Sequence, residues 1–212
     1  MDKLNQGLEQ FEIILTDEQS EAFRIYAKKI ATVPHNLTTI RDPEGIMVQH
    51  FLDSLVILKY FGMDYNKKFC DVGAGAGLPL LPLKIVRPEM DATFIDSRQK
   101  SVNFLNDVIR SLGLKNCRAV HAHTTQMKEE KERKKFNYVL TRALGSVSYI
   151  LENCLFLLKS GGEIFMYKGP KHEKELRAVP EKFMGKITDS EVREVRVPFL
   201  DRKRFIIRMK KI

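Results

Sequence analysis

The feature that most restricts the fold of this chain is a glycine-rich stretch, Asp71-Val-Gly-Ala-Gly-Ala-Gly-Leu-Pro79, which overlaps a short apolar run. Three glycines at alternate positions allow the backbone to turn sharply and allow a ligand to approach main-chain atoms closely. A glycine loop between a buried strand and a helix is typical of nucleotide sites in open α/β sheets. The stretch therefore predicts an α/β protein with a parallel sheet.

The segments around this loop alternate between strand and helix patterns. Short apolar runs predict strands at 69–72, 92–95, 118–121, 138–140 and 163–167. Helical patterns between them cover 80–86, 101–112 and 147–158. This order predicts a mostly parallel sheet with helices on both faces.

Two further strands are predicted near the C-terminus, at 192–197 and 205–209. The segment between them, 198–204, is too short for a helical crossover, so the two strands should pair antiparallel. The expected fold is therefore Rossmann-like, with a mostly parallel seven-stranded sheet that ends in an antiparallel strand.

The N-terminal part of the chain has a different pattern, which predicts helices. Thr16 begins one helical run, and a second run with apolar residues at helical spacing extends from 47 to 60. We therefore expect an N-terminal helical extension, residues 1–62, that packs on a cofactor-binding domain, residues 63–212, within one globular unit.

Composition limits the cellular setting and the partners. The chain has 212 residues, 43% of them apolar, without the roughly 18–20-residue apolar run of a membrane span or a signal peptide at its start. We expect a cytoplasmic protein with no membrane partner. Lys and Arg number 36 against 27 Asp and Glu, and the net charge of +9 makes an anionic partner such as nucleic acid plausible.

Two smaller features of the composition suggest no special chemistry. The three cysteines are widely spaced, which indicates small buried residues rather than disulfides or a zinc site. The charged run 128–135 mixes both signs and indicates a solvated helix or loop.

Two cofactor classes fit a glycine loop, and the neighbouring residues favour one of them. A dinucleotide site has the spacing G-x-G-x-x-G, whereas the glycines here are Gly73, Gly75 and Gly77. Asp71 would repel a diphosphate, but it could hold the ammonium group of S-adenosyl-L-methionine (AdoMet). Asp96 ends the second predicted strand, where its carboxylate could accept hydrogen bonds from both ribose hydroxyls. A purely structural turn is the alternative for the glycines alone, and the two carboxylates in register favour AdoMet.

Further motifs carry a resemblance to a known family. They are Asn36-Leu-Thr, Asp42-Pro-Glu, His50-Phe-Leu-Asp53-Ser-Leu, the glycine stretch 71–79, Asp96-Ser with Lys100 and Phe104-Leu, Thr141-Arg-Ala143 and Lys168-Gly169. Over nearly its whole length the chain resembles class I AdoMet-dependent methyltransferases. Among them it resembles most the ribosomal RNA small subunit methyltransferase G family, also called glucose-inhibited division protein B.

Members of that family transfer a methyl group from AdoMet to N7 of a guanine in the decoding-region loop of bacterial 16S rRNA. The resemblance thus implies a 16S rRNA (guanine-N7)-methyltransferase. Its substrate would be the rRNA within the 30S subunit or a precursor, and the enzyme would act as a monomer.

The glycine loop and the resemblance together give the expected site residues. Those expected to bind the cofactor are Asp71, Gly73, Gly75, Gly77, Leu78, Asp96, Thr124, Thr125 and Arg142. Those expected on the substrate side are Asn36, His50, Asp53 and Lys168. The family usually has an arginine and a glutamate flanking one residue at 123–125, so backbone groups of Thr124 and Thr125 would have to meet the adenine here.

The chemistry of guanine N7 decides what the catalytic residue has to do. N7 exposes a lone pair, so its methylation requires in-line alignment but no deprotonation, and we expect no general base. Positive charge moves into the guanine during transfer. Arg142, the expected catalytic residue, should therefore contact O6, a phosphate or the cofactor carboxylate rather than N7. A salt bridge at the strand end is the alternative for Arg142.

The other polar candidates have two interpretations each. His50 and Asp53 share a helix face, so they either form a bonded pair over the cofactor pocket or a polar pair on the helix surface. Lys168 either meets an RNA phosphate or belongs to a strand-end turn. His121 and His123 alternate along a strand without a third ligand, so we expect no metal.

Two other functions remain open from the sequence. An AdoMet-dependent enzyme acting on a protein or small molecule is one, although 141–143 does not resemble an Asn-Pro-Pro-Tyr-type amide site. A non-catalytic ribosome-binding protein with a relic fold is the other. It would have no affinity for AdoMet, whereas intact Asp71, Asp96 and glycine loop favour cofactor binding.

Overall fold

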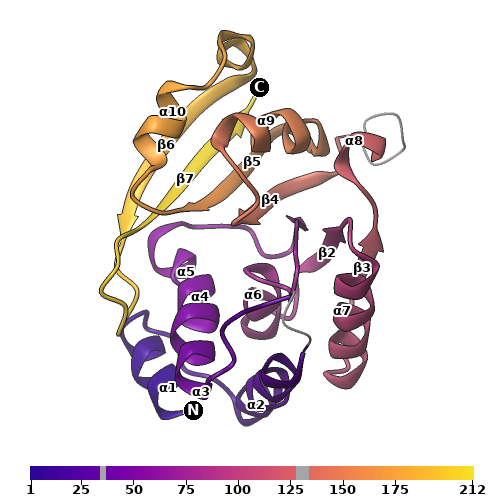
Figure 1. Ribbon diagram of the computed structural model, residues 1–212, viewed down its shortest axis with the longest axis vertical. Helices are drawn as coiled ribbons and strands as arrows, with labels where there is room; N and C mark the ends of the chain where they lie inside the picture. The colour runs from indigo at the N-terminus through magenta and orange to yellow at the C-terminus, as the bar shows by residue number, and fades with distance from the viewer. Residues whose placement is uncertain (34–36, 128–133) are drawn as a thin grey trace.

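The protein forms one seven-stranded sheet with helices on both faces (Figure 1). The computed structural model describes residues 1–33, 37–127 and 134–212, with the backbone only at 125 and 126. The strands are β1 (Lys68–Val72), β2 (Asp91–Asp96), β3 (Cys117–His121), β4 (Phe136–Arg142), β5 (Leu158–Lys168), β6 (Ile187–Val195) and β7 (Arg204–Lys211). Their order is β3-β2-β1-β4-β5-β7-β6.

Strands β1 to β5 are parallel, and β7 is antiparallel to both β5 and β6. This arrangement confirms the predicted Rossmann-like fold and the antiparallel C-terminal pair. Because the five parallel strands all end at the same edge, the loops that follow β1, β2, β4 and β5 gather there. Open α/β sheets bind their ligands at that carboxyl edge.

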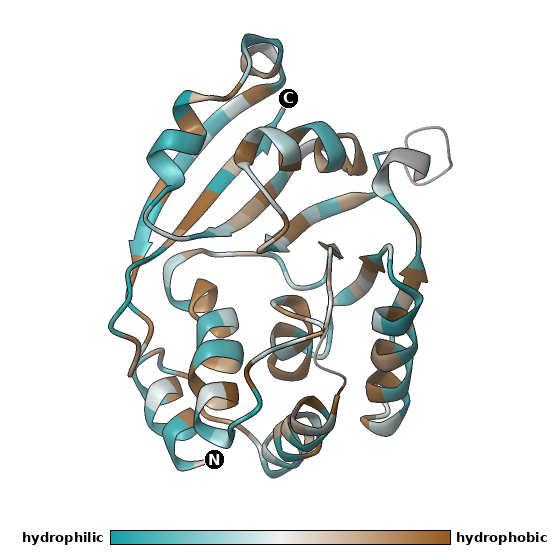
Figure 2. Ribbon diagram, in the orientation of Figure 1, coloured by the Kyte–Doolittle hydropathy of each residue, from teal (hydrophilic) through white to brown (hydrophobic). Residues whose placement is uncertain are grey.

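Helices cover both faces of the sheet (Figure 1). Those of the parallel part are α6 (Leu80–Val86), α7 (Gln99–Ser111), α8 (Thr124–Met127) and α9 (Val147–Cys154). The C-terminal part adds α10 (His172–Arg177) and the 3₁₀ helix η3 (Glu181–Lys186). Apolar side chains form two buried clusters, one containing α6 and α7 with the N-terminal helices and one containing α9. In Figure 2 the brown, hydrophobic parts of the helices turn toward the sheet.

The expected helix at 147–158 is too long. Helix α9 ends at Cys154, a 3₁₀ turn, η2 (Leu155–Leu157), follows, and Leu158 already begins β5. The apolar run continues through all three elements, with Leu155 and Leu157 buried. Periodicity therefore could not reveal the change from helix to strand.

The strand expected at 192–197 is present, but both of its predicted limits are wrong. Strand β6 begins at Ile187 and stops at Val195, which pairs with the first residue of β7, Arg204. The chain has to leave the ladder here, and Pro198 has no N–H with which to continue it. The early start was missed because this edge strand is mostly exposed and polar.

The N-terminal helices pack on α6 and α7. They are α1 (Asp2–Glu9), α2 (Asp17–Thr32), α3 (Pro43–Gly45), the π-helix η1 (Ile46–Leu52), α4 (Asp53–Leu55) and α5 (Ile57–Tyr60). Thr16 and Gln19 form a capping box that starts α2. The Tyr26 ring of α2 stacks on Phe51 of η1, with ring centres 5.1 Å apart. The buried Tyr26 hydroxyl donates to the Ala76 carbonyl at 2.6 Å, so the N-terminal helices hold the glycine loop directly.

The structure also bears on the expectations about membrane-spanning helices, the cysteines and the charged run 128–135. Within the described ranges, no helix is long and apolar enough to cross a membrane. Cys70 and Cys154 are buried as expected, whereas Cys117 is only partly buried. Most of the charged run 128–135 lies outside the described residues.

Candidate active site

The glycine loop turns at the carboxyl edge of β1. The lack of a side chain serves a different purpose at Gly77 than at Gly75. A Cβ on Gly77, which has φ +96°, would lie 2.9 Å from Leu105 Cδ2 and 3.0 Å from Leu81 Cβ. This glycine therefore allows α7 and α6 to pack closely. A Cβ on Gly75 would lie 3.6 Å from Arg98 Nη2 and 3.9 Å from the Gly73 carbonyl oxygen, which are ordinary contact distances. Gly75 thus leaves space open beside the loop.

The two predicted acidic residues hold this loop in place. Asp71 is fully buried, and its Oδ2 accepts a hydrogen bond from the Leu80 N–H at 3.2 Å, at the start of α6. Asp96 ends β2, and its Oδ2 accepts from the Gly75 N–H at 2.8 Å. Its Oδ1 accepts from the Arg98 N–H at 2.8 Å. Both carboxylates therefore order the backbone of the loop.

Asp71 has one oxygen without a partner. Oδ1 is buried and receives no hydrogen bond from the protein. Burial raises the pKa of Asp71 to about 8, partly offset by the bond from Leu80 and by the Arg142 charge. A buried carboxyl oxygen without a hydrogen-bond partner destabilises the folded protein. A cationic group bound beside it would therefore be stabilised strongly.

A small hollow lies between the ends of β1, β2, β3 and β4. Its lining includes the predicted residues Gly73, Asp96 and the buried Thr124. Leu144 and Tyr149 also line it, and sequence reasoning missed both. Tyr149 is an exposed aromatic near the start of α9, and that exposure is not visible in an apolar helical run.

Not every predicted cofactor residue lies around this hollow. Gly77 and the buried Leu78 belong to the packed part of the loop and are absent from the lining. The fully buried Asp71, Gly75 and Arg142 are absent from it as well, and Arg142 lines a separate cavity. Thr125 is in α8, but its side chain lies outside the described residues, as does all of Asn36.

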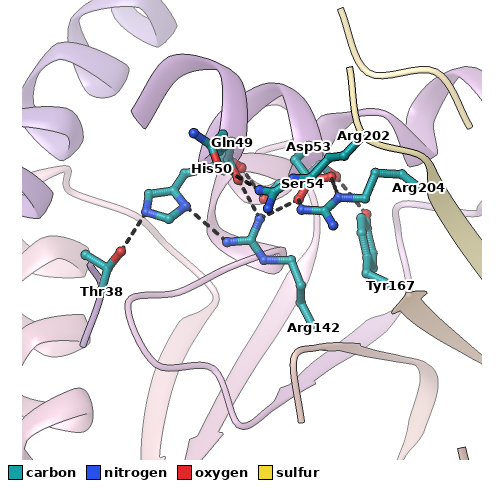
Figure 3. A network of polar contacts seen from close by, with 9 residues as sticks. All are labelled: Thr38, Gln49, His50, Asp53, Ser54, Arg142, Tyr167, Arg202 and Arg204. Carbon is teal, nitrogen blue, oxygen red and sulfur yellow. Dashed lines mark hydrogen bonds and ion pairs between the residues drawn. The ribbon is translucent and has the colours of Figure 1, made fainter. Parts of the chain in front are cut away.

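Two of the predicted substrate-side residues, His50 and Asp53, meet around Arg142, at the end of β4 (Figure 3). The Arg142 Nη1 donates to the Gln49 carbonyl and to Asp53 Oδ2, both at 3.0 Å. The Arg142 Nη2 donates to His50 Nδ1 at 3.2 Å. Segments about ninety residues apart in the chain are thereby joined, and the expected pair of His50 and Asp53 is linked through Arg142.

The contacts of His50 fix its protonation state. Because a guanidinium can only donate, His50 Nδ1 must accept, and the ring proton sits on Nε2. Nε2 lies 2.9 Å from the Thr38 hydroxyl oxygen and donates to it. Burial, with the Arg142 charge as the second cause, lowers the pKa of His50 to about 4. His50 is therefore neutral at pH 7 and has no free lone pair.

Asp53 is shared by two arginines. It is 2% exposed and also accepts from Arg204 of β7, whose Nε and Nη2 lie 2.9 and 3.2 Å from its two oxygens. Sequence reasoning missed Arg204 as a partner of Asp53. The Asp53 carboxylate thus binds two guanidinium groups. Because Arg204 holds Asp53 in place, Asp53 in turn holds Arg142.

Around this network lies a larger cavity of about 490 Å³. Its charged lining residues are Arg142, Arg202, Arg204, Lys168, Asp53 and Glu175, which leave a net charge of +2. The buried Lys168 donates to Glu175 Oε2 at 2.6 Å and to the Gly145 carbonyl. Lys168 therefore already has an anionic partner, while Arg202 reaches the cavity from the loop before β7.

Known proteins share this fold. A predicted O-methyltransferase from Agrobacterium tumefaciens has a TM-score of 0.57 at 19% identity and covers 76% of this chain and 79% of its own. A SAM-dependent methyltransferase from Aquifex aeolicus has a TM-score of 0.54 at 20% identity, covering 84% and 98%. M. jannaschii TYW2 in complex with AdoMet has a TM-score of 0.54 at 15% identity, covering 94% and 78%. The chain thus has the fold of class I AdoMet-dependent methyltransferases.

Sequence comparison narrows the class to one family. The family model for rRNA small subunit methyltransferase G matches residues 19–206. A relative of that name from Desulforamulus reducens is 34% identical over 99% of this chain and 89% of its own. Another, from Lactobacillus helveticus, is 37% identical over 97% and 88%. The chain belongs to this family and is therefore a methyltransferase of ribosomal RNA, as the sequence motifs predicted.

Proposed function

We propose that this protein transfers a methyl group from AdoMet to N7 of a guanine in the decoding-region loop of bacterial 16S rRNA. The observation that carries the proposal is the bonding state of the pocket around Arg142. Its imidazole is neutral with both nitrogens engaged, and its carboxylates, Asp53 and Glu175, are paired with cations. No unpaired base faces this pocket among the described residues, which suits a nucleophile that needs no deprotonation.

The residues at the glycine loop fit AdoMet as the cofactor. The orphaned, buried Asp71 Oδ1 suits a cationic amino group, which would restore the charge of a carboxyl whose pKa burial has raised. Asp96, Gly73 and Thr124 line the hollow where an adenosine would be held. When bound, AdoMet supplies the electrophilic methyl group, and the protein has only to orient it and exclude water.

Arg142 has donors left for the substrate. A guanidinium has five N–H groups, and three are used by Gln49, Asp53 and His50. The two that remain are on Nε and Nη2. They suit an acceptor such as guanine O6 or a phosphate oxygen, while the anchored half of the group keeps its position. Placing the cation on O6 keeps it away from N7, where positive charge develops.

The net positive charge of the cavity suits a nucleotide rather than an apolar or cationic substrate. Guanine N7 lies in the deep, narrow major groove of an A-form helix, so the target base must be in a loop or be splayed out. We place the reaction on 16S rRNA within the 30S subunit or a precursor, in the cytoplasm, with the enzyme as a monomer.

Methyl transfer from radiolabelled AdoMet tests the proposal. Unmethylated 30S subunits and protein-free 16S rRNA are incubated with the protein, and the labelled nucleoside is identified after digestion. We expect label on 7-methylguanosine in at least one of the two substrates. Binding of AdoMet without label in either RNA would favour a protein or small-molecule substrate. Absence of AdoMet binding would favour a non-catalytic ribosome-binding protein.

A further inference from the structure

A band of positive charge follows the edge of the sheet opposite the active site, where the parallel strands begin. We infer that this band binds the sugar-phosphate backbone of the rRNA at a point separate from the methylated base. The inference rests on the proposed rRNA substrate, and the band contains no residue of the pocket around Arg142. Two neighbouring hollows form it.

The first hollow lies where β7 ends and β6 begins, and it has a volume of about 380 Å³. Its charged lining residues are Lys134, Lys182, Lys186, Lys211 and Glu152. Lys182 pairs with Glu152 at 2.5 Å, and Lys211 donates to two carbonyl oxygens, one at the start of η2 and one at the start of β5. Four ammonium groups and one side-chain carboxylate thus line this hollow, a net charge of +3 that an external anion would stabilise.

The second hollow, of about 160 Å³, lies where β1, β2, β3 and β4 begin. Its charged lining residues are Lys68, Arg118, Lys135 and Asp91. Lys134 and Lys135 are consecutive and line one hollow each, so the two hollows adjoin. Because the strands involved are neighbours in the sheet, the band runs across it from β3 to β7.

The band holds much of the charge of the protein. Seven cations and two carboxylates line the two hollows and leave five positive charges, against nine for the whole chain. The cavity around Arg142, with a net charge of +2, therefore accounts for a smaller share.

The dimensions suit a strand of RNA. Five strand-to-strand steps separate β3 from β7, which at about 4.8 Å each gives a band of about 24 Å. Strand β4 has seven residues, so the band lies about 20 Å from Arg142 at about 3.3 Å per residue. An RNA that fills the active site must therefore extend beyond the target loop to reach the band. Lysines at such distances would position the RNA without reading its sequence.

A triple variant, Lys68→Gln/Lys134→Gln/Lys186→Gln, tests the inference. Lys134 and Lys186 line the first hollow and Lys68 the second. All three residues are exposed, so the substitutions should leave the fold intact. The dissociation constants of protein-free 16S rRNA, of 30S subunits and of a short hairpin with only the target loop are measured between 50 and 200 mM KCl. The control, Arg24→Gln/Lys59→Gln/Lys174→Gln, removes the same charge from exposed positions elsewhere.

For the triple variant we expect binding of both 16S rRNA and 30S subunits to weaken at least tenfold at 100 mM salt. The slope of log affinity against log salt should become shallower by about 2, since each lost phosphate contact removes about 0.7–0.9. The hairpin should bind as tightly as it does to the unmodified protein. An effect no larger than that of the control, or an equal loss with the hairpin, would overturn the inference.

A loss confined to 30S subunits would assign the band to an acidic ribosomal protein instead of RNA and would also overturn it. The binding measurement needs no methyl transfer. A failure of the inference is therefore distinct from a failure of the proposed reaction, which would show as absent 7-methylguanosine.

Discussion

Replacing Asp53 with asparagine removes the charge that anchors Arg142 while keeping the shape of the side chain. The carboxylate is 2% exposed and accepts one hydrogen bond from Arg142 and two from Arg204. Charge-assisted hydrogen bonds contribute about 1.5–3 kcal/mol each. The arginine side chains are 16% and 21% exposed, so solvent screens part of that energy, and the amide retains one acceptor oxygen. We expect a net destabilisation of about 2–3 kcal/mol.

For a chain of this size, 1 kcal/mol corresponds to a change in Tm of about 2–4 °C. Thermal unfolding of Asp53→Asn followed by circular dichroism should therefore show a Tm lower by roughly 5–10 °C. Loss of one anchor should also reduce kcat for methyl transfer by about 10- to 100-fold, with AdoMet affinity nearly unchanged. The matched control is Asp64→Asn, which breaks an exposed pair with Lys67 at 3.6 Å and should cost less than about 1 kcal/mol. Equal stability and activity of the two variants would refute the anchoring role of Asp53.

The remaining predictions concern the cofactor loop and His50. Asp71→Asn should raise the AdoMet dissociation constant at least tenfold by calorimetry, with little change in Tm; an unchanged constant would remove this carboxylate from cofactor binding. Gly77→Ala should lower stability by about 2 kcal/mol, because its Cβ would meet Leu105 at 2.9 Å and its φ of +96° is strained for alanine; chemical denaturation measures this loss. His50→Asn keeps an acceptor near the Nδ1 position and should retain more transfer activity than His50→Gln, whose amide lies nearer Nε2; the reverse order in kcat would argue against the bond to Arg142. The pKa of His50 is about 4 in the folded protein against 6.5 in the unfolded chain, which stabilises the native state above pH 6.5. This contribution should be lost as the pH falls from 6.5 through 4. His50→Asn should therefore lose less stability than the unmodified protein between pH 6.5 and 4.

The strand order and the position of the glycine loop were predictable because they depend on local patterns. Short apolar runs, glycines with positive φ and carboxylates at strand ends occur at fixed offsets from one another. The same local reasoning failed where one apolar pattern continues through three successive elements, α9, η2 and β5.

The bonding of the active site was only partly predictable. Sequence motifs marked His50, Asp53 and Arg142, but not the fact that Arg142 connects the other two. Arg204 lies 151 residues from Asp53, and nothing in the local sequence of either residue indicates their pairing. Such contacts depend on how the loop before β7 folds back over the carboxyl edge, which is decided by tertiary packing.

Tyr149 and Leu144 were missed for a related reason. Both line the hollow beside Asp96, yet in the sequence they belong to an apolar stretch that reads as core. Tyr149 lies in the first turn of α9 and Leu144 in the loop between β4 and α9, and only the spatial arrangement of these two elements reveals that both side chains face the hollow.

In the proposed reaction, Arg142 orients a guanine whose N7 needs no general base. Its most direct test compares the unmodified protein with Arg142→Ala in two assays, formation of 7-methylguanosine in 16S rRNA and calorimetric binding of AdoMet. We predict 7-methylguanosine as the labelled nucleoside with the unmodified protein and at least a hundredfold loss of its formation in the variant, with AdoMet affinity changed less than about threefold. Label on another nucleoside, or equal losses of transfer and AdoMet binding, would contradict the account.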